Sequence, residues 1–445
     1  MSGVHPAVRR TLVRAAFGLI TLGPLLLSLV QLDPGRGFWV NLSVAAGFVA
    51  LALLGLQFVI AARWARVVTP FGADVVLQFH RQVTALIVLL ALGHPLVLFV
   101  WDTRFLALLD VVHAPWRAKL AVASVVALLA IGVTSVWRSR LRLSYPAWQA
   151  LHAALALVVV VAALAHVLMI GYYVDQPWEQ ALWLAYSAAF LWIGVWVRVV
   201  KPLQRWRRRW HVVSVAEEGA GCHALELEPS PSARVAGRGA GSVFAPGQFA
   251  WISLGRSPFA LTYHPFSYAS SAATPDRLRF IVRAHGPFTS GLHDVSPGDA
   301  VYIDGPWGHF SPDRVDAAGL LLVGGGVGIT PMLSVLLTRR DRGDRRPAVL
   351  VVAARDEASL IATDVLDTLA DDPDVTVVPV LSAPSGSWTG ERGRLRTDVL
   401  RRHLPADVRG WQCYVCGPDA MMDATEDAAR EAGIAVVHSE RFSMV

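Results

Sequence analysis

The chain has 445 residues, of which 54% are hydrophobic and only 17% charged, and this excludes both a single small domain and a disordered protein. The first 200 residues contain 14 Lys and Arg against 6 Asp and Glu, whereas the remainder contain 26 against 28. The sequence therefore predicts an apolar, basic membrane half joined to an ordinary water-soluble half. Because the basic excess lies beside apolar runs, it indicates membrane orientation and not nucleic-acid binding.

Six apolar stretches of about 20 residues, the length that crosses a bilayer as a helix, follow one another in the first half. They cover residues 12–32, 38–62, 75–101, 117–137, 148–172 and 179–200. Arginines gather before the first stretch and after the second, fourth and sixth, while the opposite connections hold few and balanced charges. The positive-inside rule then predicts a multi-pass protein of the cell membrane, in contact with lipid, with both termini in the cytoplasm.

Two of these stretches carry matched histidines: His80 and His94 lie on the third, and His152 and His166 on the fifth, each pair 14 residues apart. Fourteen residues of α-helix return to within roughly 40° of the same face, about 21 Å further along the axis. Both stretches run in the same direction, so His80 lies level with His152, and His94 with His166. Each level could hold one haem iron; structural or pore-lining histidines are the alternative. Zinc is disfavoured because no cysteine or carboxylate joins either pair.

The second half begins after a basic segment, residues 201–209, and changes to short alternating runs broken by Pro and Gly. These runs start near residues 211, 222, 247, 278 and 299, a spacing typical of an antiparallel β-barrel. From residue 319 onward strands alternate with helices, which are expected over 331–340, 359–370 and 419–432, and this is typical of a doubly wound α/β domain. We expect three domains: a six-helix transmembrane bis-haem domain at 1–205, a β-barrel at 206–314 and an α/β domain at 315–445.

The segment GGGVGITP, residues 324–331, lies between the first strand of the α/β domain and its helix. Glycines let backbone N–H groups approach a pyrophosphate, and the helix N-terminus stabilises its charge. The motif therefore predicts a dinucleotide site, with a ligand-free glycine turn as the alternative. Three cysteines are too few for a disulfide framework. Cys413 and Cys416 lie three apart on an expected strand, which places them on opposite faces and excludes a redox dithiol.

HPFSYAS, residues 264–270, resembles the flavin-binding motif of the ferric reductase and NADPH oxidase superfamily, whose cytoplasmic half resembles plant ferredoxin–NADP reductase. The resemblance extends through the spans with paired histidines, GGGVGITP, YVCGP at 414–418 and SERF at 439–442. It implies two b-type haems on the histidine pairs, FAD on the barrel, and NADPH or NADH on the α/β domain.

The resemblance also implies roles for individual residues around the flavin. Those that would contact the flavin ring and ribityl chain are His264, Pro265, Phe266 and Ser267. Those that would hold the FAD diphosphate are Arg283, Thr289 and Ser290. Phe442 would stack on the flavin until nicotinamide displaces it, although it could equally be a core aromatic.

A second set of implied roles concerns the nicotinamide dinucleotide. The residues that would bind it are Gly324, Gly326, Gly328 and Thr330. Cys416 would lie beside the nicotinamide, so the catalytic set is Ser267, Cys416 and Phe442. Arg355 and Arg394 could meet the 2′-phosphate of NADPH, or could be solvated surface side chains.

The implied activity is NAD(P)H oxidation coupled to reduction of an acceptor outside the cell. The oxygen-reducing members carry a polar residue or histidine one helical turn after the outer haem ligand, which here is His94, and this chain has Leu98 at that position. They also carry an arginine in the second span, which here is apolar until Arg63. These departures favour a ferric chelate over oxygen. The alternatives are an NADPH oxidase producing superoxide or hydrogen peroxide, a membrane-anchored flavin reductase serving a protein partner, and a haem-bearing anchor or transporter with a regulatory nucleotide domain.

Overall fold

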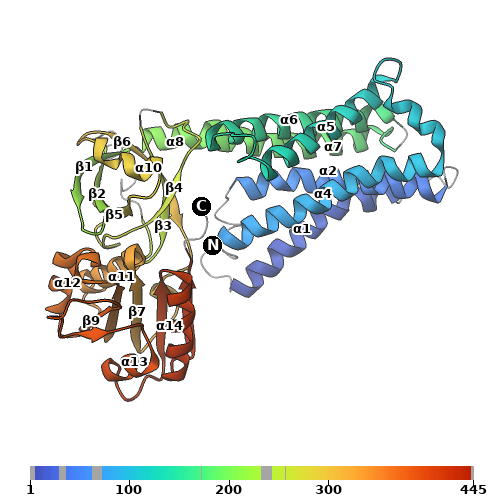
Figure 1. Ribbon diagram of the computed structural model, residues 1–445. Helices are drawn as coiled ribbons and strands as arrows, with labels where there is room; N and C mark the ends of the chain where they lie inside the picture. The colour runs from blue at the N-terminus through green and yellow to red at the C-terminus, as the bar shows by residue number, and fades with distance from the viewer. Residues whose placement is uncertain are drawn as a thin grey trace. The chain divides into compact units, whose positions relative to one another are not determined.

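The computed structural model describes residues 6–29, 37–62, 73–171, 173–231, 243–255 and 257–441. The chain forms two compact units, Met1–Pro202 and Leu203–Val445. In the described residues the first unit is helical, and the second contains two β-sheets with their helices (Figure 1).

The helices of the first unit follow the apolar stretches of the sequence. They are α1 Pro6–Leu29, α2 Phe38–Ala61, α4 Ala73–Trp101, α5 Trp116–Val136, α6 Tyr145–Ile170 and α7 Pro177–Val195. Five of the described helices are long and apolar enough to cross a membrane, whereas the apolar part of α1, Thr11–Leu27, is shorter. The expectation of six equivalent spans is therefore corrected to five long apolar helices and a shorter one.

The last membrane helix does not end where the apolar run ends. After α7 the chain continues through a π-helical turn, η3 Trp196–Val200, into α8 Lys201–Arg207. The basic segment predicted as a connection thus begins as helix. Arg205 on α8 forms an ion pair with Asp304 at 2.5 Å, and its guanidinium lies 4.8 Å from the centre of the Tyr263 ring.

Two antiparallel helix pairs, α2 with α4 and α5 with α6, make up most of the bundle. Small and hydroxylic residues allow close approach of these helices. The Ser124 hydroxyl on α5 donates to the Val159 carbonyl on α6 at 3.0 Å. A Cβ on Gly55 of α2 would lie 2.2 Å from the Phe190 ring of α7, so only glycine fits there. A 3₁₀ helix, η2 Thr103–Leu109, lies between α4 and α5.

The first sheet of the second unit is an antiparallel half-barrel with the strand order β4-β3-β6-β1-β2-β5. Its strands are β1 Trp210–Glu217, β2 Cys222–Pro229, β3 Phe249–Leu254, β4 His264–Ser267, β5 Leu278–Arg283 and β6 Ala300–Trp307. Five of the six match the alternating runs of the sequence. Strand β4 was not predicted because it contains Pro265, and its edge position explains why proline is tolerated.

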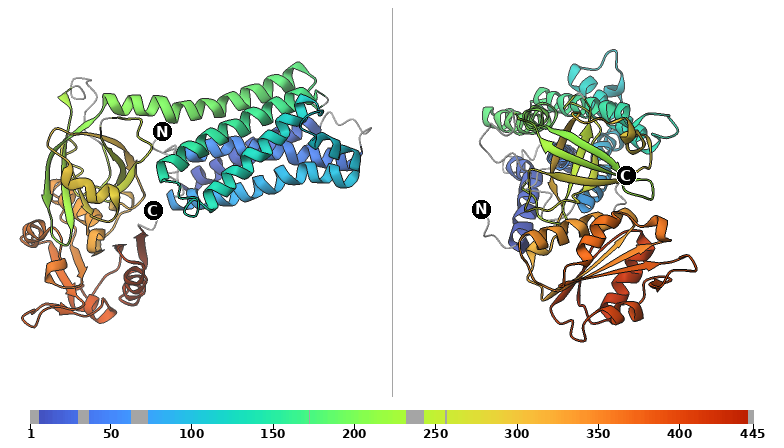
Figure 2. Two further views of the ribbon diagram at one scale, coloured as in Figure 1. Left: turned by 45° about the horizontal axis from the view of Figure 1, so that its top comes forward. Right: turned by 90° about the vertical axis from the view of Figure 1, so that its left-hand side faces the viewer.

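The second sheet is parallel, with the order β10-β9-β8-β7-β11-β12. Its strands are β7 Gly319–Gly325, β8 Ala348–Ala354, β9 Val375–Leu381, β10 Glu391–Arg392, β11 Trp411–Cys416 and β12 Val436–Glu440. Helices cover both faces (Figure 2), and they are α11 Thr330–Asp341, α12 Thr363–Ala370, α13 Thr397–His403 and α14 Asp419–Glu431. Strands β10 and β12 and helix α13 were not predicted.

Each face of the parallel sheet has its own apolar core. Cys416 packs on the face covered by α11 and α12, and Cys413 packs on the face covered by α13 and α14. The prediction that the two cysteines lie on opposite faces is confirmed. The first core continues into the half-barrel, because Phe310 and Ile281 belong to it.

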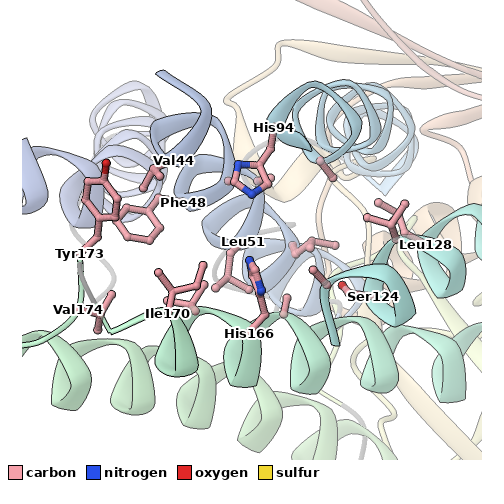
Figure 3. Close-up of a pocket in the computed structure, with 18 residues that line it drawn as sticks. Val44, Phe48, Leu51, His94, Ser124, Leu128, His166, Ile170, Tyr173 and Val174 are labelled. Atoms are coloured by element: carbon pink, nitrogen blue, oxygen red, sulfur yellow. The ribbon is translucent and has the colours of Figure 1, made fainter. Parts of the chain in front are cut away.

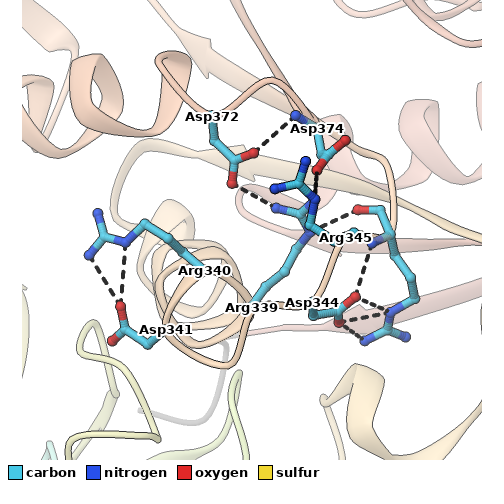
Figure 4. A network of polar contacts seen from close by, with 8 residues as sticks. Arg339, Arg340, Asp341, Asp344, Arg345, Asp372 and Asp374 are labelled. Atoms are coloured by element: carbon cyan, nitrogen blue, oxygen red, sulfur yellow. Dashed lines mark hydrogen bonds and ion pairs between the residues drawn. The ribbon is translucent and has the colours of Figure 1, made fainter.

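An arginine network stabilises the amino-terminal edge of the parallel sheet (Figure 4). The Arg339 side chain, only 2% exposed, pairs with Asp372 at 2.9 Å and donates to the Arg346 carbonyl at 2.8 Å. Arg345 pairs with Asp374 at 2.8 Å. Arg339 lies near the end of α11, and its partners lie directly before β8 and β9. The network is therefore at the edge opposite to the carboxyl ends where doubly wound folds bind ligands.

Candidate functional site: histidine slot and nucleotide cleft

His94 and His166 face each other from α4 and α6, as the 14-residue spacing of the histidines predicts (Figure 3). Their ring centres are 6.3 Å apart, with an angle of 70° between the ring planes. The structure therefore brings together two imidazoles from different helices inside the membrane unit.

Hydrogen bonds fix the protonation of both rings. The Nδ1 atom of His94 lies 2.7 Å from the Ser43 carbonyl, and Nδ1 of His166 lies 2.8 Å from the Arg117 carbonyl. A carbonyl only accepts hydrogen bonds, so Nδ1 carries the proton in each ring. The Nε2 lone pair is then the one available to a metal.

An apolar slot with a cavity volume of about 100 Å³ surrounds this histidine pair. It is lined by α2, α4, α5 and α6 and by Tyr173 and Val174. The polar side chains in the lining are those of His94, His166, Ser124 and Tyr173. Apolar walls with a few placed polar groups are typical of the lining of a small-molecule or cofactor pocket.

Residues of helix α2 contact His94 and fix its position. The Ser43 hydroxyl donates to the His94 carbonyl at 2.6 Å, and one turn later a Cβ on Gly47 would lie 3.3 Å from His94 Nδ1. Tyr173 donates to Asn41 Oδ1 at 2.7 Å near the amino-terminal end of the same helix. Ser43, Gly47 and Asn41 were not predicted as site residues. A serine and a glycine four residues apart in an apolar span were the sequence feature that pointed to the first two.

His80 and His152 lie one level further along α4 and α6, at the end near Ala73 and Tyr145. Both rings are partly buried, and the Nδ1 atom of each is buried without a hydrogen-bond partner in the described residues. The Trp148 ring lies 5.4 Å from the His152 ring. Buried polar atoms of this kind are usually satisfied by a partner, which here could be a bound ligand group.

The predicted flavin motif forms edge strand β4 of the half-barrel. The His264 ring stacks on Phe288 at 3.9 Å, and Phe266 lies 6.2 Å from the same ring. Burial lowers the pKa of His264, so this imidazole is neutral at pH 7. The Ser267 hydroxyl is buried without a hydrogen-bond partner among the described residues, which leaves it available to a ligand. Pro265 pairs with Trp251 in the sheet.

Phe288 also brings the predicted diphosphate segment next to this strand, because it belongs to α10 Pro287–Ser290. The Thr289 hydroxyl accepts a hydrogen bond from the His285 backbone N–H at 2.7 Å and thus shapes the turn. Arg283 ends β5, and both Arg283 and Ser290 are exposed. The two predicted flavin segments are therefore neighbours in the structure.

The glycine motif lies where the strand order of the parallel sheet reverses. From β7 the chain proceeds outward through β8, β9 and β10, and then returns to β11 on the other side of β7. Such a switch point, at the carboxyl ends of the strands, is where doubly wound folds bind ligands. Gly324 and Gly325 end β7, and η6 Gly326–Ile329 leads into α11.

Close packing makes glycine necessary in this loop. A Cβ on Gly328 would lie 2.3 Å from the Cys416 carbonyl oxygen, and one on Gly324 would lie 2.7 Å from Ile329. Gly326 has a φ of +54°, which glycine adopts without strain. The Thr330 side chain is buried and donates to the Val327 carbonyl at 2.9 Å, so it stabilises the loop.

Cys416 ends β11 beside this loop and is fully buried. Burial, together with the nearby Glu440, raises the pKa of its thiol well above the ordinary value, so the thiol is protonated at neutral pH. Burial likewise raises the pKa of Cys413 to about 12. Neither thiol is therefore a nucleophile in this state.

Glu440 is a site residue that the sequence analysis did not single out. It pairs with Cys416 in the register of β11 and β12, and its Oε1 lies 3.3 Å from the position of a Cβ on Gly308. The Phe249 ring lies 3.1 Å from the same position, and Phe249 pairs with Ser267. Glu440 therefore lies close to Gly308 and Phe249 of the half-barrel and is the strand partner of Cys416. The sequence feature that pointed to Glu440 was its position in the SERF motif, residues 439–442.

Arg355 and Arg394 are both exposed near the carboxyl edge of the parallel sheet. Arg355 follows β8 and Arg394 follows the short strand β10, which pairs with the end of β9. Phe442 lies outside the described residues.

Three successive parts of the chain match known protein families. Residues 46–163 match the family described as ferric reductase like transmembrane component. Residues 236–311 match a FAD-binding domain, and residues 322–427 match an oxidoreductase NAD-binding domain.

Individual relatives share part of the chain. The reductase component of propane 2-monooxygenase from Rhodococcus jostii is 31% identical over 194 residues, 42% of this chain and 51% of the relative. NADH-cytochrome b5 reductase 1 from Neosartorya fischeri is 30% identical over 183 residues, 39% of this chain and 58% of the relative. The chain thus matches little more than half the length of these relatives. The solved Amycolatopsis cytochrome P450 reductase GcoB is 26% identical, with a TM-score of 0.45, over 52% of this chain and 68% of that one.

The apolar helices, the flavin strand and the nucleotide loop together define a multi-pass membrane flavoprotein that is an NAD(P)H-dependent oxidoreductase. The chain has the architecture of the ferric reductase and NADPH oxidase superfamily, with a ferric reductase like transmembrane component, a FAD-binding domain and an NAD-binding domain in that order.

Proposed function

We propose that this protein transfers electrons from cytoplasmic NAD(P)H, through FAD and two b-type haems, to an acceptor outside the cell, and that the favoured acceptor is a ferric chelate. The observation that carries this proposal is the pair formed by His94 and His166. The rings face each other across an apolar slot, and backbone carbonyls hold their Nδ1 protons.

The spacing of this pair suits a single iron ligated from both sides. An imidazole nitrogen binds a first-row metal at about 2.0–2.1 Å and the ring centre lies about 1 Å beyond it, so two such rings have centres roughly 6 Å apart. The observed separation is 6.3 Å. His94 and His166 would hold the outer haem, and His80 and His152 the inner one.

In the second unit, the proposed ligands of FAD are the strand His264–Ser267 with Arg283, Thr289 and Ser290. The chemistry that the bound groups supply is hydride transfer at FAD and one-electron transfer at haem iron. Ser267 and the neutral His264 orient the flavin, and Gly324, Gly326, Gly328 and Thr330 shape the loop for a dinucleotide. Buried Cys416 limits the space beside the nicotinamide, while Phe442 and the exposed Arg355 and Arg394 set the choice between NADPH and NADH.

The outer end of the slot supports a bulky acceptor. Tyr173 and Val174, which line the slot, belong to the short connection between α6 and α7. The lining contains no carboxylate and no lysine or arginine side chain in the described residues. Such a slot has few groups that could bind a small polar oxidant. A large chelate needs only to touch the mouth of the slot to accept an electron. Superoxide production is the competing outcome.

A second candidate is a flavin reductase that serves a protein partner. The relatives support it, because several of them are named as reductase components of oxygenase systems. In that case the membrane unit is an anchor, and the purified protein contains FAD without haem.

The test uses purified full-length protein in sealed vesicles with the soluble unit facing outward. A membrane-impermeant ferric chelate and a ferrous indicator are trapped inside, and NADPH is added outside. We expect trapped iron to be reduced at the rate of NADPH oxidation, and reduction to persist when superoxide is scavenged. If oxygen consumption accounts for every electron while the trapped iron stays ferric, the oxidase alternative holds and the proposed acceptor is wrong.

A further inference from the structure

Helix α11, which follows the glycine loop, carries two buried hydroxyl groups, those of Ser334 and Thr338. The two residues are only 0% and 1% exposed. They lie four residues apart, so they share one face of the helix. A buried hydroxyl group costs free energy unless it forms hydrogen bonds. Both groups therefore need partners, and the partners identify which part of the protein they hold.

These partners include backbone groups of the half-barrel. The Ser334 hydroxyl donates to the Ser270 carbonyl at 2.8 Å. The Thr338 hydroxyl accepts a hydrogen bond from the Ala272 backbone N–H at 2.8 Å, and it donates to the Ser334 carbonyl at 2.6 Å. Two side chains of α11 thus bind the segment 270–272 of the half-barrel. We call Ser334 and Thr338, with these partners, the hydroxyl bridge.

The hydroxyl bridge joins the two segments to which the cofactors were assigned above. Segment 270–272 begins three residues after Ser267, the last residue of flavin strand β4. On the other side, Ser334 lies about one helical turn into α11, which starts directly after the glycine loop. Ala269 and Ile329, from the same two parts of the chain, belong to one apolar core. The bridge therefore connects the flavin strand to the nucleotide loop through a few rigid bonds.

We propose that Ser334 and Thr338 are positioning residues for hydride transfer from NAD(P)H to FAD, an inference that rests on the binding roles proposed for β4 and the glycine loop. In this step a C–H bond of the nicotinamide breaks and an N–H bond of the flavin forms with the same electron pair. NAD(P)H is thereby oxidised and FAD reduced. Donor and acceptor atoms must lie about 3–3.5 Å apart for such a step. The hydroxyl bridge fixes this approach without touching either cofactor.

Thr338→Val removes the hydroxyl group and keeps the branched shape of the side chain. The Ala272 N–H then loses its acceptor, so segment 270–272 and α11 move slightly apart. We expect the limiting rate of FAD reduction by NADPH to fall by about tenfold, a part of the roughly 100-fold loss that misplacement by about 1 Å causes. The dissociation constant for NADPH and the FAD content should stay at wild-type values, because the glycine loop and β4 themselves are unchanged.

Thr338→Ser keeps the hydroxyl group and should therefore retain the wild-type rate. The matched control is Thr425→Val. Thr425 is also fully buried in a helix of the α/β domain, and its hydroxyl donates to the Met421 carbonyl of the same helix at 2.7 Å. Its substitution should leave the limiting rate unchanged. Stopped-flow reduction of the detergent-purified full-length protein at increasing NADPH concentration gives both the limiting rate and the dissociation constant.

A second measurement follows the hydrogen bond itself, without added nucleotide. Amide hydrogen exchange at Ala272 should be slow in the wild type and faster in Thr338→Val, because the N–H is no longer held by a hydrogen bond. Thr338→Ser and Thr425→Val should exchange as the wild type does. Unchanged exchange in Thr338→Val would show that Thr338 does not hold this segment in solution, and would overturn the proposal.

Ser334→Ala provides a second variant in case Thr338→Val does not fold. It removes only the hydrogen bond to the Ser270 carbonyl, and it should also lower the limiting rate while leaving the affinity for NADPH unchanged. A wild-type limiting rate in the folded variants, or a loss that appears only in the dissociation constant, would overturn the positioning role. Wild-type protein whose FAD is not reduced by NADPH at all would instead contradict the proposed function.

Discussion

Replacement of either outer histidine, in His94→Ala or His166→Ala, is expected to lower the haem content from two per chain to one. Each variant leaves a single imidazole at the outer level, and loss of one of two strong ligands weakens iron binding severely. Reduction of an external acceptor should fall by about 100-fold, the upper end of the loss that removal of an outer-shell partner of a metal site produces. Reduction of a soluble dye by NAD(P)H and FAD should persist, because the second unit is unchanged.

A pyridine haemochrome assay measures the haem content, which is then compared with the FAD and protein contents of the same sample. His113→Ala is the matched control, because His113 is an exposed histidine that pairs with Asp110 at 2.8 Å outside the slot. It should retain two haems. The inner variants His80→Ala and His152→Ala should each remove the other haem. Folded His94→Ala protein with an unchanged haem content would rule out His94 as a ligand.

The second large effect concerns the nucleotide loop. In Gly328→Val the new side chain has no space, because even a Cβ would lie 2.3 Å from the Cys416 carbonyl oxygen. The loop must move away from β11, so NAD(P)H oxidation should fall by about 100-fold or more, as misplacement of about 1 Å can do. Dithionite should still reduce the haems, since it bypasses the nucleotide site.

Stopped-flow reduction of FAD by NADPH measures the change directly. Gly386→Val is the matched control, because nothing lies within 4 Å of a Cβ at Gly386 and its backbone is not left-handed. It should reduce FAD at the wild-type rate. A normal rate in Gly328→Val would show that this loop does not position the dinucleotide.

The sequence was most informative where chemistry depends on periodicity. The 14-residue spacing predicted which histidines meet, and His94 and His166 do lie together. The alternation of strands and helices predicted a parallel sheet with the glycine loop after its first strand, and β7, η6 and α11 confirm this order. Such patterns are readable because helices and strands repeat regularly.

The sequence was least informative where partners are backbone atoms or irregular segments. The carbonyls of Ser43 and Arg117 hold the two outer imidazoles, and any residue type can supply a carbonyl. Strand β4 contains a proline and is only four residues long, so it has no alternating pattern. Glu440 meets Cys416 through pairing of β12 with β11, which depends on the parallel register and not on local sequence.

The most direct test of the central claim is the ratio of haem to FAD in the purified full-length protein, combined with the haem spectrum after anaerobic addition of NADPH. The account predicts two b-type haems per FAD, both reduced by NADPH, with the bis-histidine spectrum expected of His80, His94, His152 and His166. A folded protein that contains FAD and oxidises NADPH but carries no haem would contradict it.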